Sequence, residues 1–221
     1  IPVSTPNTYQ ITTLSDAHCS NVAGSMSGSA TVTVASPPTI STIAAPSAIC
    51  DGQKITAPPV TVTQNNGTEQ SSGWQYCATE NGTYSNFNPT EKTWAYSENG
   101  YYIRYYSANQ CGTTQYSNKV QVTVKPNPTI TLTKNPDDAQ ICANTGIVIT
   151  GNGTGSSYEW TCSGTAGTPS GTGNSVYSLP AQANNYTVNC TSTLNGCTST
   201  ATTNVSVYPD LASGAGEIET E

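Results

Sequence analysis

The sequence predicts an all-β protein made of tandem antiparallel β-sandwiches that are stapled by disulfides, with no significant helix. Three observations predict this class. Only 9% of the 221 residues are charged, and Ser, Thr, Asn and Gly, which favour strands and turns over helices, fill much of the remainder. Eight cysteines accompany a single Met and a single His. Cysteines, tryptophans and alternating strands also recur about 90 residues apart.

The repeat begins twice with the same tripeptide, at Pro38 and at Pro128. A cysteine, a tryptophan, a Tyr-x-Ile or Tyr-x-Val strand, a second cysteine and a closing Val-rich strand follow in the same order. The matched pairs are Cys50 and Cys142, Trp74 and Trp160, Tyr101 and Tyr186, and Cys111 and Cys197. Alternation in the closing strands is the pattern of a sheet with one buried face. Two immunoglobulin-like sandwiches are therefore predicted, at 38–125 and 126–209.

The first 37 residues repeat only the end of this unit. Tyr9-x-Ile11, Cys19 and the strand from Thr31 to Val34 match its last hairpin. An isolated hairpin is marginal in water, so residues 1–37 are predicted to be the C-terminal hairpin of an incomplete domain. The missing strands come either from upstream sequence or from another molecule. The first is favoured, because a donated segment usually supplies one strand and about five are missing.

Prolines mark the boundaries between these blocks. They lie at Pro37-Pro38 and at Pro126-Asn127-Pro128, where they stiffen short linkers. The stretch 210–221 is small and acidic, without apolar periodicity, and is predicted to be a linker or tail.

Charge and residue inventory exclude several function classes. The net charge of −7, with six basic residues, disfavours nucleic acid and anionic membranes as partners, and no apolar stretch is long enough for membrane insertion. His18 is the only histidine. A single histidine without Cys-x-x-Cys spacing does not complete a usual zinc site, and it leaves His18 as the one possible base of a catalytic triad. Asp137-Asp138 lacks calcium-loop spacing and is interpreted as a polar turn. No enzyme activity and no cofactor are expected.

Several segments together resemble a known family. They are Tyr9 to Cys19 with the following Thr-Val run, Gly73-Trp74-Gln75, and Asn99 to Tyr105 continuing to Cys111. This combination resembles the immunoglobulin-like and PKD-like repeats of very large surface proteins of Bacteroidota, including gliding-motility adhesins exported by type IX secretion. The resemblance implies a stalk or adhesin at the cell surface or in the medium, and it brings no catalytic residues. The recurring cysteines independently indicate an oxidising compartment, which is the periplasm, the cell surface or the medium.

An aromatic strand offers the one hint of ligand binding. Alternation directs Tyr101, Ile103 and Tyr105 inward and directs a ladder of three residues outward: Tyr102, Arg104 and Tyr106. Such a ladder suits surface glycans or host or neighbouring proteins. The favoured interpretation is that it stabilises cross-strand pairing.

Repeat position and alternation also predict the disulfides. One bridge is expected in each complete sandwich, Cys50–Cys111 and Cys142–Cys197. A further bridge, Cys162–Cys190, is expected across the sheets and packed near Trp160, as in immunoglobulin domains. Cys19 and Cys77 are left unpaired or intermolecular, with Cys77 turned outward because it lies three residues after Trp74.

These observations favour a structural or adhesive segment of an extended surface or secreted repeat protein, joined to upstream and downstream immunoglobulin-like domains of the same or a neighbouring chain. Two alternatives stay open. One is a carbohydrate-binding accessory module of a secreted polysaccharide-degrading enzyme, with the aromatic ladder as the sugar platform. The other is a subunit of a self-assembling extracellular filament completed by strand exchange.

Overall fold

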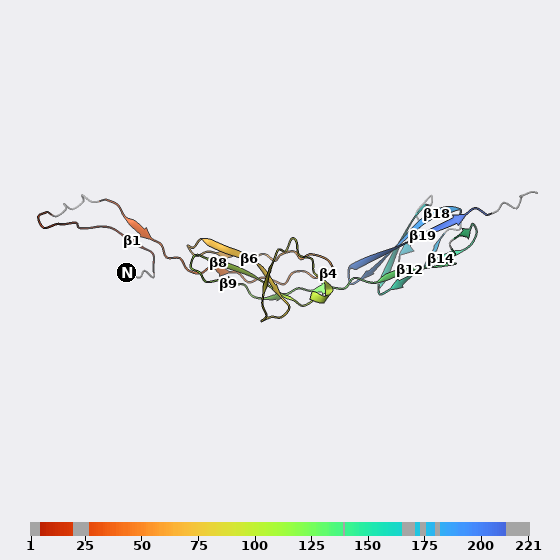
Figure 1. The fold of residues 1–221 in the computed structure, drawn as a ribbon, viewed down its shortest axis with the longest axis horizontal. Coiled ribbons are helices and arrows are strands. Elements are labelled where there is room, and N and C mark those ends of the chain that lie inside the picture. The colour runs from red at the N-terminus through yellow and green to blue at the C-terminus, as the bar shows by residue number, and fades with distance from the viewer. Residues whose placement is uncertain are drawn as a thin grey trace, which may run out of the picture. The chain divides into compact units, whose positions relative to one another are not determined.

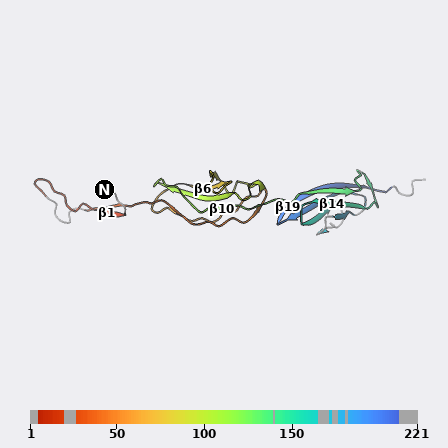
Figure 2. The same cartoon turned by 90° about the horizontal axis from the view of Figure 1, so that it is seen from below.

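The computed structural model describes residues 5–19, 27–138, 140–164, 171–172, 176–179 and 182–210. The predicted tail, 210–221, lies outside these residues apart from Asp210. The described chain consists of strands β1 to β19 and one 3-10 turn, η1 (Tyr96–Glu98), and contains no α-helix. The all-β class is therefore confirmed (Figures 1 and 2).

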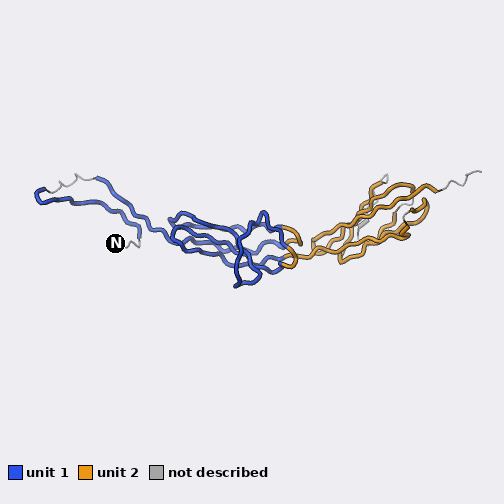
Figure 3. Tube along the Cα trace, viewed as in Figure 1, with its two compact units in different colours: residues 1–48, 54–94, 98–123 blue, residues 49–53, 95–97, 124–221 orange. Residues whose placement is uncertain are grey.

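The chain forms two compact units (Figure 3). Unit 1 comprises 1–48, 54–94 and 98–123, and unit 2 comprises 49–53, 95–97 and 124–221. The short segment 49–53 lies within the stretch predicted as the first sandwich, yet it belongs with unit 2.

Unit 2 contains two facing sheets. One has the order β12-β14-β17 and the other the order β13-β19-β18-β15-β16. β13 pairs parallel with β19, whereas β12 pairs antiparallel with β14, so the chain changes sheets between its first two strands. This is the immunoglobulin strand arrangement. The strands are β12 (Ile130–Asn135), β13 (Ile141–Cys142), β14 (Ile147–Gly153), β15 (Ser157–Ser163), β16 (Gly171–Thr172), β17 (Val176–Leu179), β18 (Asn184–Leu194) and β19 (Cys197–Tyr208).

Alternating side chains from both sheets build the core of unit 2. Along β18, Tyr186, Val188 and Cys190 are buried while their neighbours are less so, which is the alternation expected of a one-sided strand. The long hairpin of β18 and β19 closes on Asn195-Gly196, both with positive φ (52° and 86°). That conformation matches the right-handed twist of the strands and explains why Asn-Gly stands at this turn.

Unit 1 repeats much of this order. Its main sheet runs β10-β8-β6-β7, with β9 also paired to β8, and β3 pairs antiparallel with β5. β4 (Ile49–Cys50) and β11 (Val124–Lys125), which pair parallel as β13 and β19 do, are counted with unit 2. Besides the first hairpin, the strands of unit 1 are β3 (Thr39–Ile40), β5 (Val62–Thr63), β6 (Glu69–Cys77), β7 (Ser85–Phe87), β8 (Tyr102–Asn109), β9 (Gln115–Tyr116) and β10 (Val120–Gln121).

The two units share one register at their centres. Trp74 on β6 lies opposite Tyr105 on β8, and Trp160 on β15 lies opposite Cys190 on β18. Tyr105 therefore occupies the place of Cys190, as the repeat match predicts.

The first hairpin pairs β1 (Asn7–Tyr9) antiparallel with β2 (Ala30–Val32). In the part of the chain that the structure describes, neither strand pairs with any other. Tyr9, Ile11 and Val32 are exposed, at 39%, 71% and 39%. The hairpin thus presents apolar side chains that a complete sandwich would bury.

Candidate functional site

The predicted ladder on β8 is half-buried rather than exposed. Tyr102, Arg104 and Tyr106 all have intermediate exposure, and Ile103 between them is fully buried. The ring of Tyr106 lies over Gly73 of the neighbouring strand, where an added Cβ would stand 3.3 Å from it. Gly73 is therefore the residue that makes room for this tyrosine.

Arg104 is enclosed by two tyrosines that the sequence pattern did not single out. Its guanidinium carbon lies 3.9 Å from the ring centre of Tyr84 and 3.8 Å from that of Tyr116. Two rings at these distances must occupy opposite faces of the planar guanidinium, and its Nε also donates to Oε1 of Gln75 at 3.0 Å. Burial raises the pKa of the Tyr84 hydroxyl, although Arg104 opposes this. Arg104 is thus committed to internal contacts, which supports the interpretation of the ladder as cross-strand packing.

A shallow hollow lies beside this strand. Its volume is about 390 Å³, and its lining residues carry aromatic rings, hydroxyl groups and amide groups. The lining residues are Ser72, Gly73, Trp74, Asn86, Phe87, Asn88 and Tyr106. Of the predicted ladder, only Tyr106 takes part. Aromatic faces with neighbouring amides are the groups that stack on and hydrogen-bond to sugars.

The centre of unit 1 is an aromatic cluster around Trp94, which is fully buried. Its ring meets those of Tyr76 and Phe87 edge to face, each at 5.7 Å. Nζ of Lys92 lies 4.6 Å from the Trp94 ring centre and forms an ion pair with Glu98 at 2.8 Å. The sequence pattern gives no sign of the Trp94 core position, because Trp94 precedes η1 and lies outside any alternating strand.

Asp137, Asp138 and His18, the residues weighed for metal binding and catalysis, lie in loops outside the strands. Lys134 Nζ lies 3.6 Å from the Asp137 carboxylate and donates to the backbone carbonyl of Asp138, so a cation of the chain itself already sits at this turn. His18 is exposed, and its backbone N–H donates to Asp16. That bond and one from the Cys19 N–H lower the pKa of the Asp16 carboxyl. No group of three or more potential metal ligands occurs among the described residues.

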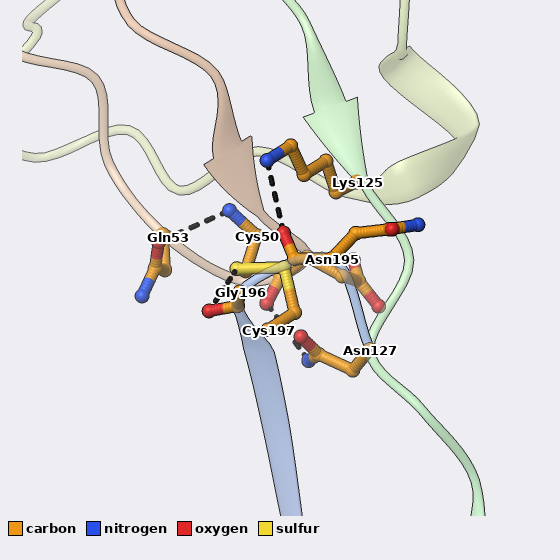
Figure 4. The surroundings of a disulfide bond; sticks show 8 residues. Cys50, Gln53, Lys125, Asn127, Asn195, Gly196 and Cys197 are labelled. Carbon is orange, nitrogen blue, oxygen red and sulfur yellow. Dashed lines mark hydrogen bonds between the residues drawn. A yellow bond between two sulfur atoms is a disulfide. The ribbon is translucent and has the colours of Figure 1, made fainter. Parts of the chain in front are cut away.

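One disulfide joins Cys50 to Cys197, with their Cα atoms 5.6 Å apart (Figure 4). Hydrogen bonds surround it: Lys125 Nζ donates to the Asn195 carbonyl, and Asn127 Nδ2 donates to the Asp51 carbonyl. Both half-cystines belong to unit 2 and lie 147 residues apart in the sequence. The bridge therefore ties segment 49–53 to the turn of the β18–β19 hairpin.

This bridge corrects the predicted pairing of Cys50 with Cys111 and of Cys142 with Cys197. Cys142 lies opposite Tyr208, the last residue of β19, whereas Cys197 is the first residue of that strand. The two ends of a 12-residue strand are about 36 Å apart. Cys50 and Cys142 have equivalent strand pairings, but Cys142 and Cys197 of one repeat lie at opposite ends of it. Cys111 and Cys142 are exposed and have no disulfide partner.

The predicted Cys162–Cys190 bridge is also absent. Both cysteines are buried, yet they stand on neighbouring strands of one sheet rather than on opposite sheets. Cys162 faces Val188 and Cys190 faces Trp160, so the two are diagonal neighbours, about 7–8 Å apart between Cα atoms and beyond the usual disulfide range. Burial raises the pKa of Cys162, and it raises that of Cys190 to about 11.

Cys77 and Cys19, predicted to be unpaired or intermolecular, have no disulfide partner within the chain. Cys19 is exposed, but Cys77 is buried rather than accessible. Cys77 lies three residues after Trp74 and opposite Tyr102, but the loop after β6 packs against its sulfur. A Cβ at Gly82 would stand 2.6 Å from the Cys77 sulfur. This cover corrects the expectation of an exposed thiol at position 77.

Solved structures that contain immunoglobulin or fibronectin(III)-like domains are similar to this chain. No family model and no curated protein matches the chain. Among solved structures, the N-terminal eight Ig domains of Down Syndrome Cell Adhesion Molecule match 82% of this chain and 26% of that one, with 16% identity and a TM-score of 0.46. The fibronectin(III)-like modules of Clostridium thermocellum CbhA match 78% of this chain and 94% of theirs, with 16% identity and a TM-score of 0.34.

Titin domains I67–I69 match 83% of this chain and 69% of theirs, with 9% identity and a TM-score of 0.36.

No helix in the described residues is long and apolar enough to cross a membrane. The strand order and pairings themselves identify the fold: the chain is an all-β protein of tandem immunoglobulin-like sandwiches.

Proposed function

We propose that the chain is a structural segment of an extended cell-surface or secreted repeat protein, with 38–125 and 126–209 as its complete domains. The observation that carries this proposal is the Cys50–Cys197 bridge. A pull on the two ends of the chain passes from residue 50 directly to residue 197 through the disulfide. Residues 51–196 are then outside the loaded path, which suits a stalk that works under tension.

Three further features support a structural or adhesive role outside the cell. A disulfide is stable in oxidising compartments. The repeated domains, separated by short proline-containing linkers, suit projection from a surface. His18 is exposed beside Asp16, and the Asp137 carboxylate lies 3.6 Å from the Lys134 ammonium group.

Single-molecule stretching tests the load path. With handles at both ends, complete unfolding of the oxidised chain is expected to give a contour shorter by about 500 Å than that of the reduced chain, because 147 residues span roughly 3.5 Å each. Cys50→Ser is expected to give the long contour without reductant. Cys77→Ser, which removes a buried thiol outside the bridge, is the matched control and keeps the short one. Equal contours for oxidised and reduced protein, or hydrolase activity on polysaccharide or peptide substrates, would contradict the proposal.

A carbohydrate-binding accessory module is the second candidate, and the hollow beside β8 is the observation that favours it. A glycan array with the intact chain tests it. Tyr106→Ala is expected to abolish binding, because Tyr106 lines the hollow, whereas Tyr102→Ala is the matched control from the same strand and is expected to retain it. Absence of binding to any glycan leaves the structural role as the sole proposal.

A further inference from the structure

Cys142 stands in the same local structure as the disulfide-bonded Cys50. Ile49 and Cys50 pair parallel with Val124 and Lys125, and Ile141 and Cys142 pair parallel with Val207 and Tyr208 in the same register. In each case a short strand ending in cysteine lies beside the last residues of the closing strand.

The turns that follow the two cysteines also agree. The N–H of Asp51 donates to the Lys125 carbonyl at 2.8 Å, and the N–H of Ala143 donates to the Tyr208 carbonyl at 2.8 Å. One residue further on, Gly52 and Asn144 both have positive φ, 81° and 65°. The backbone around Cys50 and Cys142 is therefore the same: a short parallel strand that ends in cysteine, followed by the same turn. We call this arrangement the cysteine frame. In the first of the two frames the cysteine forms a disulfide.

The partner of Cys50 defines what such a frame accepts. Cys197 follows Asn195 and Gly196 at the turn of a β-hairpin, and the Asn195 carbonyl accepts from Lys125, the residue opposite Cys50. Tyr208 takes the place of Lys125 beside Cys142 and is 47% exposed. Cys142 is exposed and reduced. Cys50 is bonded to a hairpin-turn cysteine, and Cys142 has the same backbone surroundings with an accessible thiol. We therefore expect Cys142 to accept the same kind of partner.

Two cysteines of this chain match Cys197 in the repeat and are exposed. Cys111 lies in an Asn-x-Cys turn after β8, and Cys19 lies in the loop of the first hairpin. We propose that Cys142 forms an intermolecular disulfide with one of these hairpin-turn cysteines of a second copy of the chain.

The bond forms by exchange with a small-molecule disulfide. One thiolate attacks that oxidant and gives a mixed disulfide with release of one thiol. The second thiolate then displaces the other half, so two protein thiols lose two electrons and two protons while one oxidant disulfide becomes two thiols. The inference goes beyond the load-bearing role and is independent of it, because Cys142 takes no part in the Cys50–Cys197 bridge.

Oxidation of the intact chain with oxidised glutathione tests the proposal. Non-reducing electrophoresis is expected to show covalent dimers and longer products, and peptide mapping is expected to link the Cys142 peptide to that of Cys19 or Cys111. Cys142→Ser is expected to remove these products while keeping the Cys50–Cys197 peptide, which shows that the variant folds. Cys77→Ser is the matched control, with a buried thiol, and leaves the products unchanged.

Cys19→Ser and Cys111→Ser then identify the partner, since only one of them is expected to remove the linked peptide. Tyr208→Ser is expected to slow product formation several-fold without changing alkylation of Cys142. The proposal is overturned by products that survive Cys142→Ser, by Cys142–Cys142 peptides, or by a monomer whose Cys142 ends as a mixed disulfide with glutathione.

Discussion

The two units use one strand order but fill its centre differently. In unit 1, Trp74 meets Tyr105 edge to face at 5.3 Å, and Trp94 adds an aromatic cluster with a cation. In unit 2, Trp160 stacks on Tyr177 at 5.5 Å, and buried thiols and aliphatic residues fill the remaining space. The two units therefore keep the same strand register, although the residue opposite the tryptophan is Tyr105 in unit 1 and Cys190 in unit 2.

The largest expected effect comes from deleting the central tryptophan of each unit. Trp94→Ala and Trp160→Ala each remove a side chain exposed by at most 1%, and each is expected to lower the free energy of unfolding by about 3–5 kcal/mol. The loss is expected to be larger for Trp94, because it also removes two edge-to-face contacts and the Lys92 contact. Urea unfolding followed by circular dichroism measures both.

Two outcomes would break this part of the comparison. A larger loss for Trp160→Ala would show that the stack on Tyr177 outweighs the aromatic cluster. A loss below about 1 kcal/mol for either variant would show that the site collapses around the cavity. Trp74→Ala, which removes a side chain of β6 that lines the hollow, serves as the internal reference.

A smaller effect is expected on the outward faces of the same strands. Arg104 in unit 1 and Asn189 in unit 2 occupy matched positions, each one residue before Tyr105 or Cys190. Arg104→Gln is expected to lower the free energy of unfolding by about 1–3 kcal/mol, since two cation–π contacts and the bond to Gln75 are lost. Asn189→Ala removes exposed hydrogen bonds to Thr161 and Thr202 and is expected to cost less.

Lys119→Gln is the charge-matched control for Arg104, because Lys119 contacts only the exposed Asn81 among the described hydrogen bonds. The midpoints of thermal unfolding rank Arg104→Gln, Asn189→Ala and Lys119→Gln by their loss of stability. Equal midpoints for Arg104→Gln and Lys119→Gln would mean that the guanidinium contacts do not stabilise the sheet.

Much of the fold could be predicted from the sequence, because alternation and repeated landmarks reflect local physics. The paired register of Trp74 with Tyr105 and of Trp160 with Cys190 follows from matching the repeats. The disulfides could not be predicted in this way. Repeat position identifies equivalent cysteines, but it does not say that Cys142 and Cys197 stand at opposite ends of β19. The cover over Cys77 and the two tyrosines around Arg104 come from loops and neighbouring strands, which carry no periodic signal.

The last effect depends on pH and separates the two cores by their ionisable groups. Burial raises the pKa of the Tyr177 hydroxyl to about 12 and that of the Cys190 thiol to about 11, from ordinary values of 10.0 and 9.0. The folded state therefore favours the neutral forms. Their contribution to stability is complete below about pH 9 and is lost progressively as the pH rises to about 12. Urea midpoints of unit 2 at pH 8, 10 and 11 are expected to fall in that order.

Tyr177→Phe separates the two ionisations. It keeps the stack on Trp160 and removes the hydroxyl, so the decline between pH 10 and 12 is expected to shrink, while the decline between pH 9 and 11 that comes from Cys190 persists. Cys190→Ala is expected to show the opposite pattern. Fluorescence of Trp160 in a chain carrying Trp74→Phe and Trp94→Phe reports on unit 2 by itself. If the Tyr177→Phe and wild-type midpoints fall in parallel up to pH 12, then the Tyr177 hydroxyl is solvated in the folded state, and the contrast between the two cores rests on shape alone.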